Sequence, residues 1–244
     1  MPTPNEAIND SNPQLVQHPG RKHLSLPKDA EHEVLILGDS ISNRINCNDV
    51  GESVIVRAYG GLKSTQLLEK INNTRAKEYK MVAIAIGIND ILDYENYNQK
   101  TLLNNIEKIV YQVIHKFRPN NIAILNLTPL SAYYKDFNQN VTKYNTALKQ
   151  MITKATDIQN TVKIEVLDTY NAIQKLGQGT HTDGIHPSLS GLTAIVKLYR
   201  SFLEENDIAT NNNDITMRQK PKKVEPKSDA EKTLEQLRNF FNKK

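Results

Sequence analysis

Five short apolar runs, separated by stretches with helical spacing, organise the middle of the chain. The runs are rich in Val, Ile, Leu and Ala and predict strands at 33–37, 53–57, 81–86, 121–127 and 162–167. Between and after the runs, apolar residues recur at steps of three and four. This spacing predicts helices at 63–72, 101–117, 138–156 and 188–205.

Strands that are apolar on both faces and alternate with helices are typical of a parallel sheet covered on both sides. The pattern therefore predicts a three-layer α/β/α fold with a five-stranded parallel sheet, and a single domain over residues 31–207. In such folds ligands bind beyond the carboxyl ends of the strands. Candidate chemistry should therefore follow the apolar runs directly.

Polar and glycine-rich segments follow the first three runs, and another precedes the last helix. They are Gly38-Asp39-Ser40, Tyr59-Gly60-Gly61, Gly87-Ile88-Asn89-Asp90 and Asp183-Gly184-Ile185-His186-Pro187. Together they supply a serine hydroxyl, backbone and amide N–H donors, and a histidine three residues after an acid. A nucleophile, a base held by an orienting group and donors for a developing oxyanion are the parts that acyl transfer needs.

The ordered set GDS, a glycine after the second strand, GIND and DGIHP resembles the block pattern of the SGNH (GDSL-like) hydrolases from about Val34 to Phe202. The resemblance implies a flavodoxin-like fold and a serine esterase without cofactor or metal. It implies the following roles: Ser40 as nucleophile and first oxyanion donor, Gly61 and Asn89 as further donors, His186 as base and Asp183 as its orienting acid.

The second block departs from the best-known members, where two residues separate a pair of glycines. Here Gly60 and Gly61 are adjacent, so Gly60 is the alternative backbone donor. In the first block Ile41 replaces a leucine, a change expected to affect packing and not chemistry.

Several residues near these blocks have alternative interpretations. Ser40 and Asn89 are also typical turn residues. Asp183 is an alternative cap for the last helix, although Pro187 as the first helical residue would make His186 the cap. His181, Asp183 and His186 have ligand-type side chains, but no further partner for a metal is evident. Gly177-Gln178-Gly179 lacks the preceding strand that dinucleotide binding requires. Asp39 and Asp90 are expected to shape their turns, and Tyr133 and Tyr134 either line a pocket or cover the sheet edge.

Both ends of the chain differ in composition from the middle. Residues 1–30 are polar, contain several prolines and show no hydrophobic period, so a disordered extension is expected. Residues 208–227 are rich in Asn, Lys and Pro and are typical of a linker. The net charge of +4 arises in 218–244, which carries nine basic and four acidic residues. This basic tail permits weak contact with nucleic acid.

Residues 228–244 predict a short amphipathic helix, with a capping box at Ser228 and Glu231. Its apolar face contains Leu234, Leu237, Phe240 and Phe241. The helix either docks on its own domain or binds a protein partner. Leu237, Phe240 and Phe241, followed by two lysines, resemble the box that recruits proteins to the DNA sliding clamp, although Leu234 stands at the position of its usual glutamine.

The remaining sequence features limit the class of protein. No apolar run approaches the roughly 20 residues of a membrane span, and no signal-peptide pattern opens the chain. A single cysteine, Cys47, excludes an internal disulfide. We therefore expect a cytoplasmic hydrolase of carboxylic esters, with short acyl or sugar O-acetyl groups favoured because no long apolar insertion is evident. The alternative is a catalytically idle domain that serves as a binding module.

Overall fold

The computed structural model describes residues 32–156, 162–211 and 214–216. All of them belong to one compact unit, Leu26–Arg218. The predicted N-terminal extension and the predicted C-terminal helix, including Leu237, Phe240 and Phe241, lie outside the described residues.

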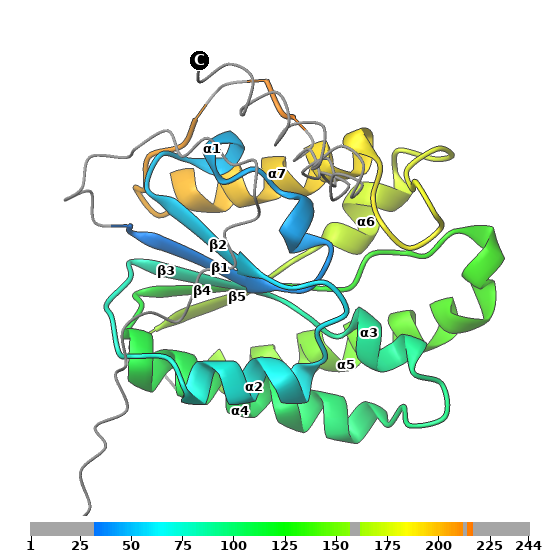
Figure 1. Cartoon of the computed structure of the whole chain (residues 1–244), viewed down its shortest axis with the longest axis horizontal. Coiled ribbons are helices and arrows are strands. Elements are labelled where there is room, and N and C mark those ends of the chain that lie inside the picture. The colour runs from blue at the N-terminus through cyan, green and yellow to red at the C-terminus, as the bar shows by residue number, and fades with distance from the viewer. Residues whose placement is uncertain (1–31, 157–161, 212–213, 217–244) are drawn as a thin grey trace, which may run out of the picture. The chain divides into compact units, whose positions relative to one another are not determined.

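Five parallel strands form one sheet in the order β2-β1-β3-β4-β5, which confirms the predicted fold class (Figure 1). The strands are β1 (Val34–Gly38), β2 (Val54–Ala58), β3 (Met81–Ala85), β4 (Asn121–Leu125) and β5 (Lys163–Leu167). Every residue of β1 and β3 is buried. These two strands are in the interior of the sheet and contact neighbours on both edges and both faces, which explains their unbroken apolar runs.

Four helices correspond to the predicted ones: α2 (Ser64–Asn72), α4 (Gln99–Phe117), α5 (Lys135–Thr156) and α7 (Leu189–Glu204). Helix α4 begins where the side chain of Asn98 accepts a hydrogen bond from the Thr101 N–H, and it ends at Arg118 in the left-handed conformation. None of the helices in the described part of the chain has the length and apolar composition that a membrane crossing needs.

Short helical segments that the sequence pattern did not predict complete the described chain. They are η1 (Ser42–Arg44), α1 (Cys47–Val50), α3 (Ile88–Leu92), η2 (Ala132–Tyr134) and α6 (Thr169–Gln174). Each is too short to show a helical period of apolar residues. Most of them follow a strand directly, at the edge of the sheet where the candidate site residues lie.

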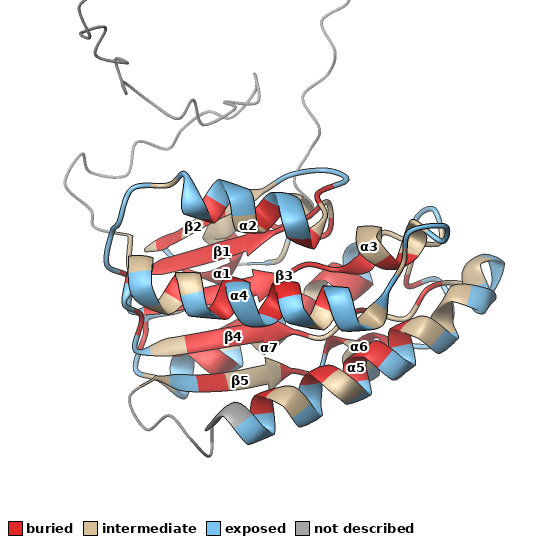
Figure 2. Ribbon diagram, turned by 90° about the horizontal axis from the view of Figure 1, so that it is seen from below, coloured by how far each residue is buried: buried red, intermediate tan, exposed pale blue. Residues whose placement is uncertain are grey.

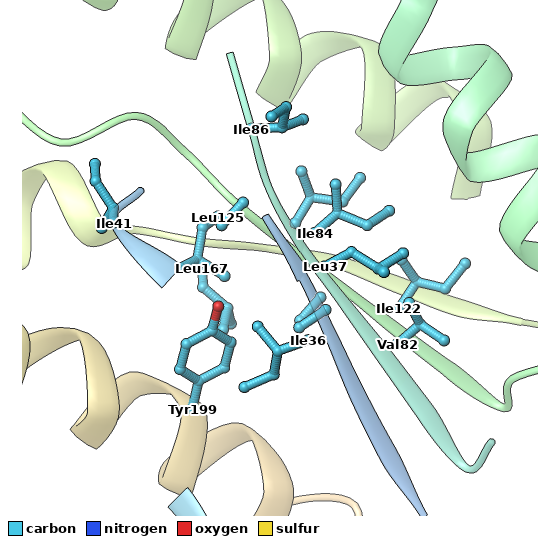
Figure 3. Packing of buried hydrophobic residues seen from close by; sticks show 14 of the residues in the cluster. Ile36, Leu37, Ile41, Val82, Ile84, Ile86, Ile122, Leu125, Leu167 and Tyr199 are labelled. Atoms are coloured by element: carbon cyan, nitrogen blue, oxygen red, sulfur yellow. The ribbon is translucent and has the colours of Figure 1, made fainter. Parts of the chain in front are cut away.

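The sheet lies between two helical layers (Figure 1). Helices α1, α6 and α7 cover one face, and α2, α4 and α5 cover the other. The helices turn their buried stripe to the sheet and their exposed side to solvent (Figure 2). Ile36 lies beside Tyr199 of α7, whereas Leu37, Val82 and Ile84 point to the opposite face (Figure 3).

The strand register fixes where the loops leave the sheet. Gly38 at the end of β1 is paired with Ala58 at the end of β2 and with Ala85 at the end of β3. The three strands therefore end level with one another. The segments that carry Ser40, Gly61 and Asn89 all begin at this edge.

Residues immediately after α7 pack against the same unit. Ile208 is buried, and the N–H of Thr216 donates to the Asp49 carboxylate at 2.8 Å. The boundary between the domain and a linker at residue 208 stays a prediction, as does the extent of the linker.

Gly38 allows a close approach that no other residue permits. A Cβ atom there would lie 2.4 Å from the Ser42 hydroxyl and 2.7 Å from the Ala85 carbonyl oxygen. We predict that Gly38→Ala lowers the free energy of unfolding by about 1–3 kcal/mol, the usual cost of overpacking, or more because a backbone atom must move. Gly60→Ala is the matched control, since its Cβ would meet nothing within 4 Å. Urea denaturation that finds equal stabilities for the two variants would contradict this account.

Candidate active site

Ser40 stands in a tight turn directly after β1. The Asp39 carboxylate accepts a hydrogen bond from the Ile41 N–H at 3.0 Å, and the Asp39 carbonyl accepts one from the Asn43 N–H at 3.0 Å. The Asp39 N–H donates to the Ala85 carbonyl of β3 at 3.2 Å. These bonds confirm that Asp39 shapes the turn, and they anchor Ser40 to the central strands.

A continuous hydrogen-bonded array joins Ser40 to His186 and Asp183. The Nε2 atom of His186 lies 2.9 Å from the Ser40 hydroxyl oxygen, and its Nδ1 atom lies 2.7 Å from Asp183 Oδ2. If Nδ1 carries the proton, Nε2 is free to accept the serine proton. The structure thus brings together three side chains from the first and last sequence blocks.

A small loop between α6 and α7 presents His186 and Asp183. His181 and Pro187 form an antiparallel bridge, and the Thr182 N–H donates to the His186 carbonyl at 2.9 Å. At the tip, Gly184 adopts a φ of +87°, a conformation that glycine tolerates best. The loop holds Asp183 and His186 on the same side.

Hydrogen bonds keep the carboxyl group of Asp183 ionised. Partial burial alone would raise its pKa, but the His186 backbone N–H and ring and the Ile185 N–H donate to its carboxylate, and the pKa falls to about 2. Asp183 does not cap the last helix, because α7 begins at Leu189 with Ser188 as the N-cap residue. The alternative in which Pro187 opens that helix is therefore wrong.

Arg44 is a residue near the site that the sequence analysis did not identify. Its Nη1 atom donates to the Thr182 hydroxyl at 3.2 Å, and its Nη2 atom lies 3.8 Å from Asp183 Oδ2. The guanidinium connects η1, just after Ser40, to the loop that carries His186. A single arginine in a turn has no sequence signature, so only its position four residues after Ser40 could have suggested a role.

Asn89 lies in the first turn of α3, beside the glycine segment. Its side-chain amide donates to the Leu62 carbonyl at 3.0 Å. An amide nitrogen carries two hydrogens, so one remains for a second acceptor. Gly61 has a φ of +72°, and the Leu62 N–H bonds back to the Tyr59 carbonyl at 3.4 Å. The contact between Asn89 and Leu62 thus connects the loop after β3 to the glycine segment after β2.

Asp90 was expected only to shape its own turn, but it also joins two loops. Its carboxylate accepts from the Ser64 N–H at 3.0 Å and from the Ser64 hydroxyl at 2.6 Å. Asn105 of α4 donates to the same hydroxyl at 2.9 Å. Burial raises the pKa of Asp90, while the hydrogen bonds from Ser64 counteract this effect. Asp90 thereby fixes the start of α2 next to α3.

Both ring nitrogens of His181 contact protein oxygens. Nε2 lies 2.7 Å from the Pro129 carbonyl, and Nδ1 lies 3.1 Å from the Thr180 hydroxyl. These contacts orient the base of the loop and leave the ring no position for a metal ion. Among the residues that the structure describes, no cluster of three or more His, Cys, Asp or Glu side chains suits a metal.

Asp39 is the buried carboxyl beneath the serine turn. Burial raises its pKa to about 7, against the lowering effect of the Ile41 N–H, and the nearby Asp90 carboxyl adds to the rise. A cavity of about 20 Å³ lies beside it, lined by Asp39, Ile41 and Thr128 among others. This volume suits a single water molecule, and the buried Thr128 hydroxyl has no protein partner.

Comparison with models of protein families identifies the GDSL-like Lipase/Acylhydrolase family over residues 37–199. The match covers all four sequence blocks that the candidate site contains. Comparison with curated protein sequences gives no match.

Solved structures of similar fold include three from different organisms. A GDSL-like lipase from Bacteroides thetaiotaomicron superposes with a TM-score of 0.59 and 20% identity over 74% of this chain and 91% of that one. A carbohydrate esterase of family 3 from Talaromyces cellulolyticus gives 0.58 and 16%, over 72% and 99%. A member of the lipolytic G-D-S-L family from Veillonella parvula gives 0.55 and 17%, over 70% and 96%. At these identities the likeness establishes the fold.

The buried carboxyl of Asp39 predicts a pH-dependent change in stability. Because burial raises the pKa of Asp39 in the folded protein to about 7 from its ordinary 3.8, the folded state binds more protons than the unfolded state between these pH values. The stability of the fold therefore falls as pH rises through this window. We predict that Asp39→Asn, which keeps an acceptor for the Ile41 N–H, removes this loss. The free energy of unfolding of the variant, relative to that of the parent, should rise between pH 4 and pH 8 by at most on the order of 4 kcal/mol.

The measurement is urea denaturation of the parent and the variant at both pH values. Other titrating groups are common to the two proteins and cancel in the difference. A stability difference that does not depend on pH would show that Asp39 is not the titrating group.

Proposed function

Because the chain belongs to the GDSL-like lipase/acylhydrolase family and is therefore a hydrolase of esters or related acyl compounds, we propose that it acts through an acyl-enzyme at Ser40. In this proposal His186 is the general base and acid, Asp183 orients it, and the Ser40 and Gly61 N–H groups and the Asn89 amide bind the oxyanion. The observation that carries the proposal is the unbroken hydrogen-bonded array from Ser40 through His186 to Asp183.

The first half of the reaction forms the acyl-enzyme. His186 Nε2 takes the Ser40 proton as the hydroxyl oxygen attacks the carbonyl carbon. The carbonyl oxygen becomes an oxyanion that accepts from the three donors. His186 then gives its proton to the departing alcohol oxygen as the ester bond breaks. Water repeats the sequence in the second half and releases the acid.

The negative charge of Asp183 stabilises His186 during both halves of the reaction. The Asp183 carboxylate stays ionised far below neutral pH because His186 and Ile185 donate to it. It therefore fixes the imidazole tautomer and stabilises the imidazolium that forms in the transition state. Arg44 limits the movement of Asp183 and Thr182 through its two contacts.

We propose short acyl groups, with acetyl esters of carbohydrates as the favoured class. No long apolar insertion that could cover an alkyl chain is evident in the sequence between the blocks that carry the site. Polar or charged groups in and beside the loop that carries His186 include Thr182, Asp183 and Arg44. Such surroundings suit a hydroxylated leaving group better than an extended lipid.

We predict that Ser40→Ala abolishes hydrolysis of p-nitrophenyl acetate and p-nitrophenyl butyrate, because no other group replaces the attacking oxygen. Ser201→Ala, an exposed serine on α7, is the matched control and retains parental turnover. Undiminished hydrolysis by purified Ser40→Ala protein would contradict the assigned nucleophile. Faster turnover by the parent on decanoyl than on acetyl esters would contradict the proposed acyl length.

We predict that Asn89→Ala lowers kcat on p-nitrophenyl acetate by about 100- to 1,000-fold, the usual effect of removing one oxyanion donor. KM should change much less, because the amide binds the transition state more strongly than the ground state. Asn104→Ala, an exposed asparagine on α4, provides the comparison. Steady-state kinetics with an unchanged kcat for Asn89→Ala would exclude this role.

A further inference from the structure

Four aromatic side chains form a continuous surface, which we call the aromatic surface: Tyr94, Phe137, Tyr134 and Tyr133. The ring centroids of Tyr94 and Phe137 are 6.2 Å apart, those of Phe137 and Tyr134 are 6.3 Å apart, and those of Tyr134 and Tyr133 are 4.9 Å apart. At its two ends Tyr94 and Tyr133 are 75% and 86% exposed. Large exposed aromatic rings in a contiguous group are typical of a binding surface.

Tyr134, next to the Tyr133 end of the aromatic surface, lies against the loop that carries Asp183 and His186. The Ser131 N–H donates to the Gly184 carbonyl at 2.9 Å. A Cβ atom on Gly184 would lie 2.9 Å from the Tyr134 ring and 2.6 Å from the Ser131 hydroxyl. The absence of a side chain at Gly184 therefore lets Tyr134 pack directly on the loop.

The other end of the aromatic surface lies beside the loop that follows Asn89. Tyr94 comes two residues after α3, the helix that contains Asn89. Its neighbour Asp93 forms an ion pair with Lys63, which follows the glycine segment. Helix α5 packs against α3, and α3 lies on the side where the strands end (Figure 1). The aromatic surface thus extends from the loop that carries His186 to the loop after the helix that contains Asn89.

The segment that holds Tyr133 is well fixed by hydrogen bonds. The Asn138 side chain accepts from the Leu130 N–H at 2.8 Å and donates to the Leu130 carbonyl at 2.9 Å. Together with the bond from Ser131 to Gly184, these contacts hold both sides of η2. A rigid tyrosine surface loses little conformational entropy on binding.

The chemistry of the aromatic surface favours a carbohydrate. Its two exposed ends are tyrosines, whose rings offer an apolar face and whose hydroxyls remain wet. Exposed Glu95, Lys135 and Asp136 are adjacent in sequence to these segments. A pyranose has the matching character, with C–H groups on its faces and hydroxyls around its rim. An alkyl chain would instead require an enclosed aliphatic groove.

We propose that the aromatic surface binds a sugar ring of an O-acylated oligosaccharide next to the acyl group that Ser40 attacks. This inference rests on the proposed function for its catalytic part, whereas the binding of sugar to Tyr94 and Tyr133 does not depend on catalysis. The surface supplies affinity for the carbohydrate part of the substrate.

The first test measures binding without chemistry. Calorimetry with xylotetraose and cellotetraose, which carry no ester, should give binding by the parent that Tyr133→Ala weakens at least tenfold. Tyr133→Phe keeps the ring and should bind within twofold of the parent. Tyr111→Ala is the matched control, because Tyr111 is an exposed tyrosine on α4 outside the aromatic surface. No binding of either sugar by the parent, or equal affinities of Tyr133→Ala and Tyr111→Ala, would overturn the proposal.

The second test compares two esters. For Tyr133→Ala and Tyr94→Ala, the ratio of kcat/KM on O-acetylated xylotetraose to kcat/KM on p-nitrophenyl acetate should fall about tenfold through a higher KM. Tyr111→Ala should keep the parental ratio. A selective loss on p-nitrophenyl decanoate would assign the surface to an acyl chain, and a dimer that Tyr133→Ala dissociates in light scattering would assign it to a second copy. Either result overturns the proposal.

Failure of the proposed function has a different signature. If the parent hydrolyses none of these esters, the nucleophile assignment is contradicted, while calorimetry still decides whether the aromatic surface binds sugar.

Discussion

The in-register parallel pairing of β1 with its two neighbours is the constraint on which the site depends. Gly38, Ala58 and Ala85 end their strands level with one another, so the segments that follow leave the sheet at one edge. Strand β2 lies on one side of β1, whereas β3, β4 and β5 follow on the other side. The boundary between β1 and β3 is therefore the switch point at which open α/β sheets leave a crevice. The last sequence block, far from Ser40 in the chain, lies at the same edge, where His186 forms a hydrogen bond with Ser40.

Two carboxyls near Ser40 have opposite environments, which shift their pKa values in opposite directions. Asp39 is buried beneath the turn, where apolar surroundings raise its pKa to about 7. Asp183 is half exposed and accepts several N–H bonds that lower its pKa to about 2. The first stabilises the turn as a hydrogen-bond acceptor at a cost in free energy once it ionises. The second keeps its negative charge where a positive imidazolium would form.

The sequence predicted the parts of the molecule that repeat a pattern. The five strands were found from unbroken apolar runs, because most of their residues are buried, and the four longer helices were found from apolar residues at steps of three and four, because they bury one face. The short helices after the strands were missed, since segments of three to six residues are too short for apolar residues to recur at helical spacing. The end of β1 and the order of the four blocks were enough to place Ser40, Asn89, Asp183 and His186 at one edge, but their roles stay predictions.

Contacts between distant loops could not be predicted from one sequence. The bond from Asp90 to Ser64, the contacts of Arg44 with Thr182 and Asp183, and the packing of Tyr134 on Gly184 join residues that are 26 or more positions apart. None of these pairs has a characteristic spacing. The bridge between His181 and Pro187 likewise has no signature in the sequence, and it keeps Pro187 in the loop before the last helix.

The central claim is that Ser40 is the nucleophile activated by His186, and covalent labelling tests it most directly. The parent and His186→Ala are treated with a fluorophosphonate, which phosphonylates activated serines, and the modified peptide is identified by mass spectrometry. The account predicts one adduct per chain, on Ser40, that forms in the parent and is lost in His186→Ala. A label on another residue, or equal labelling of Ser40 in both proteins, would contradict it.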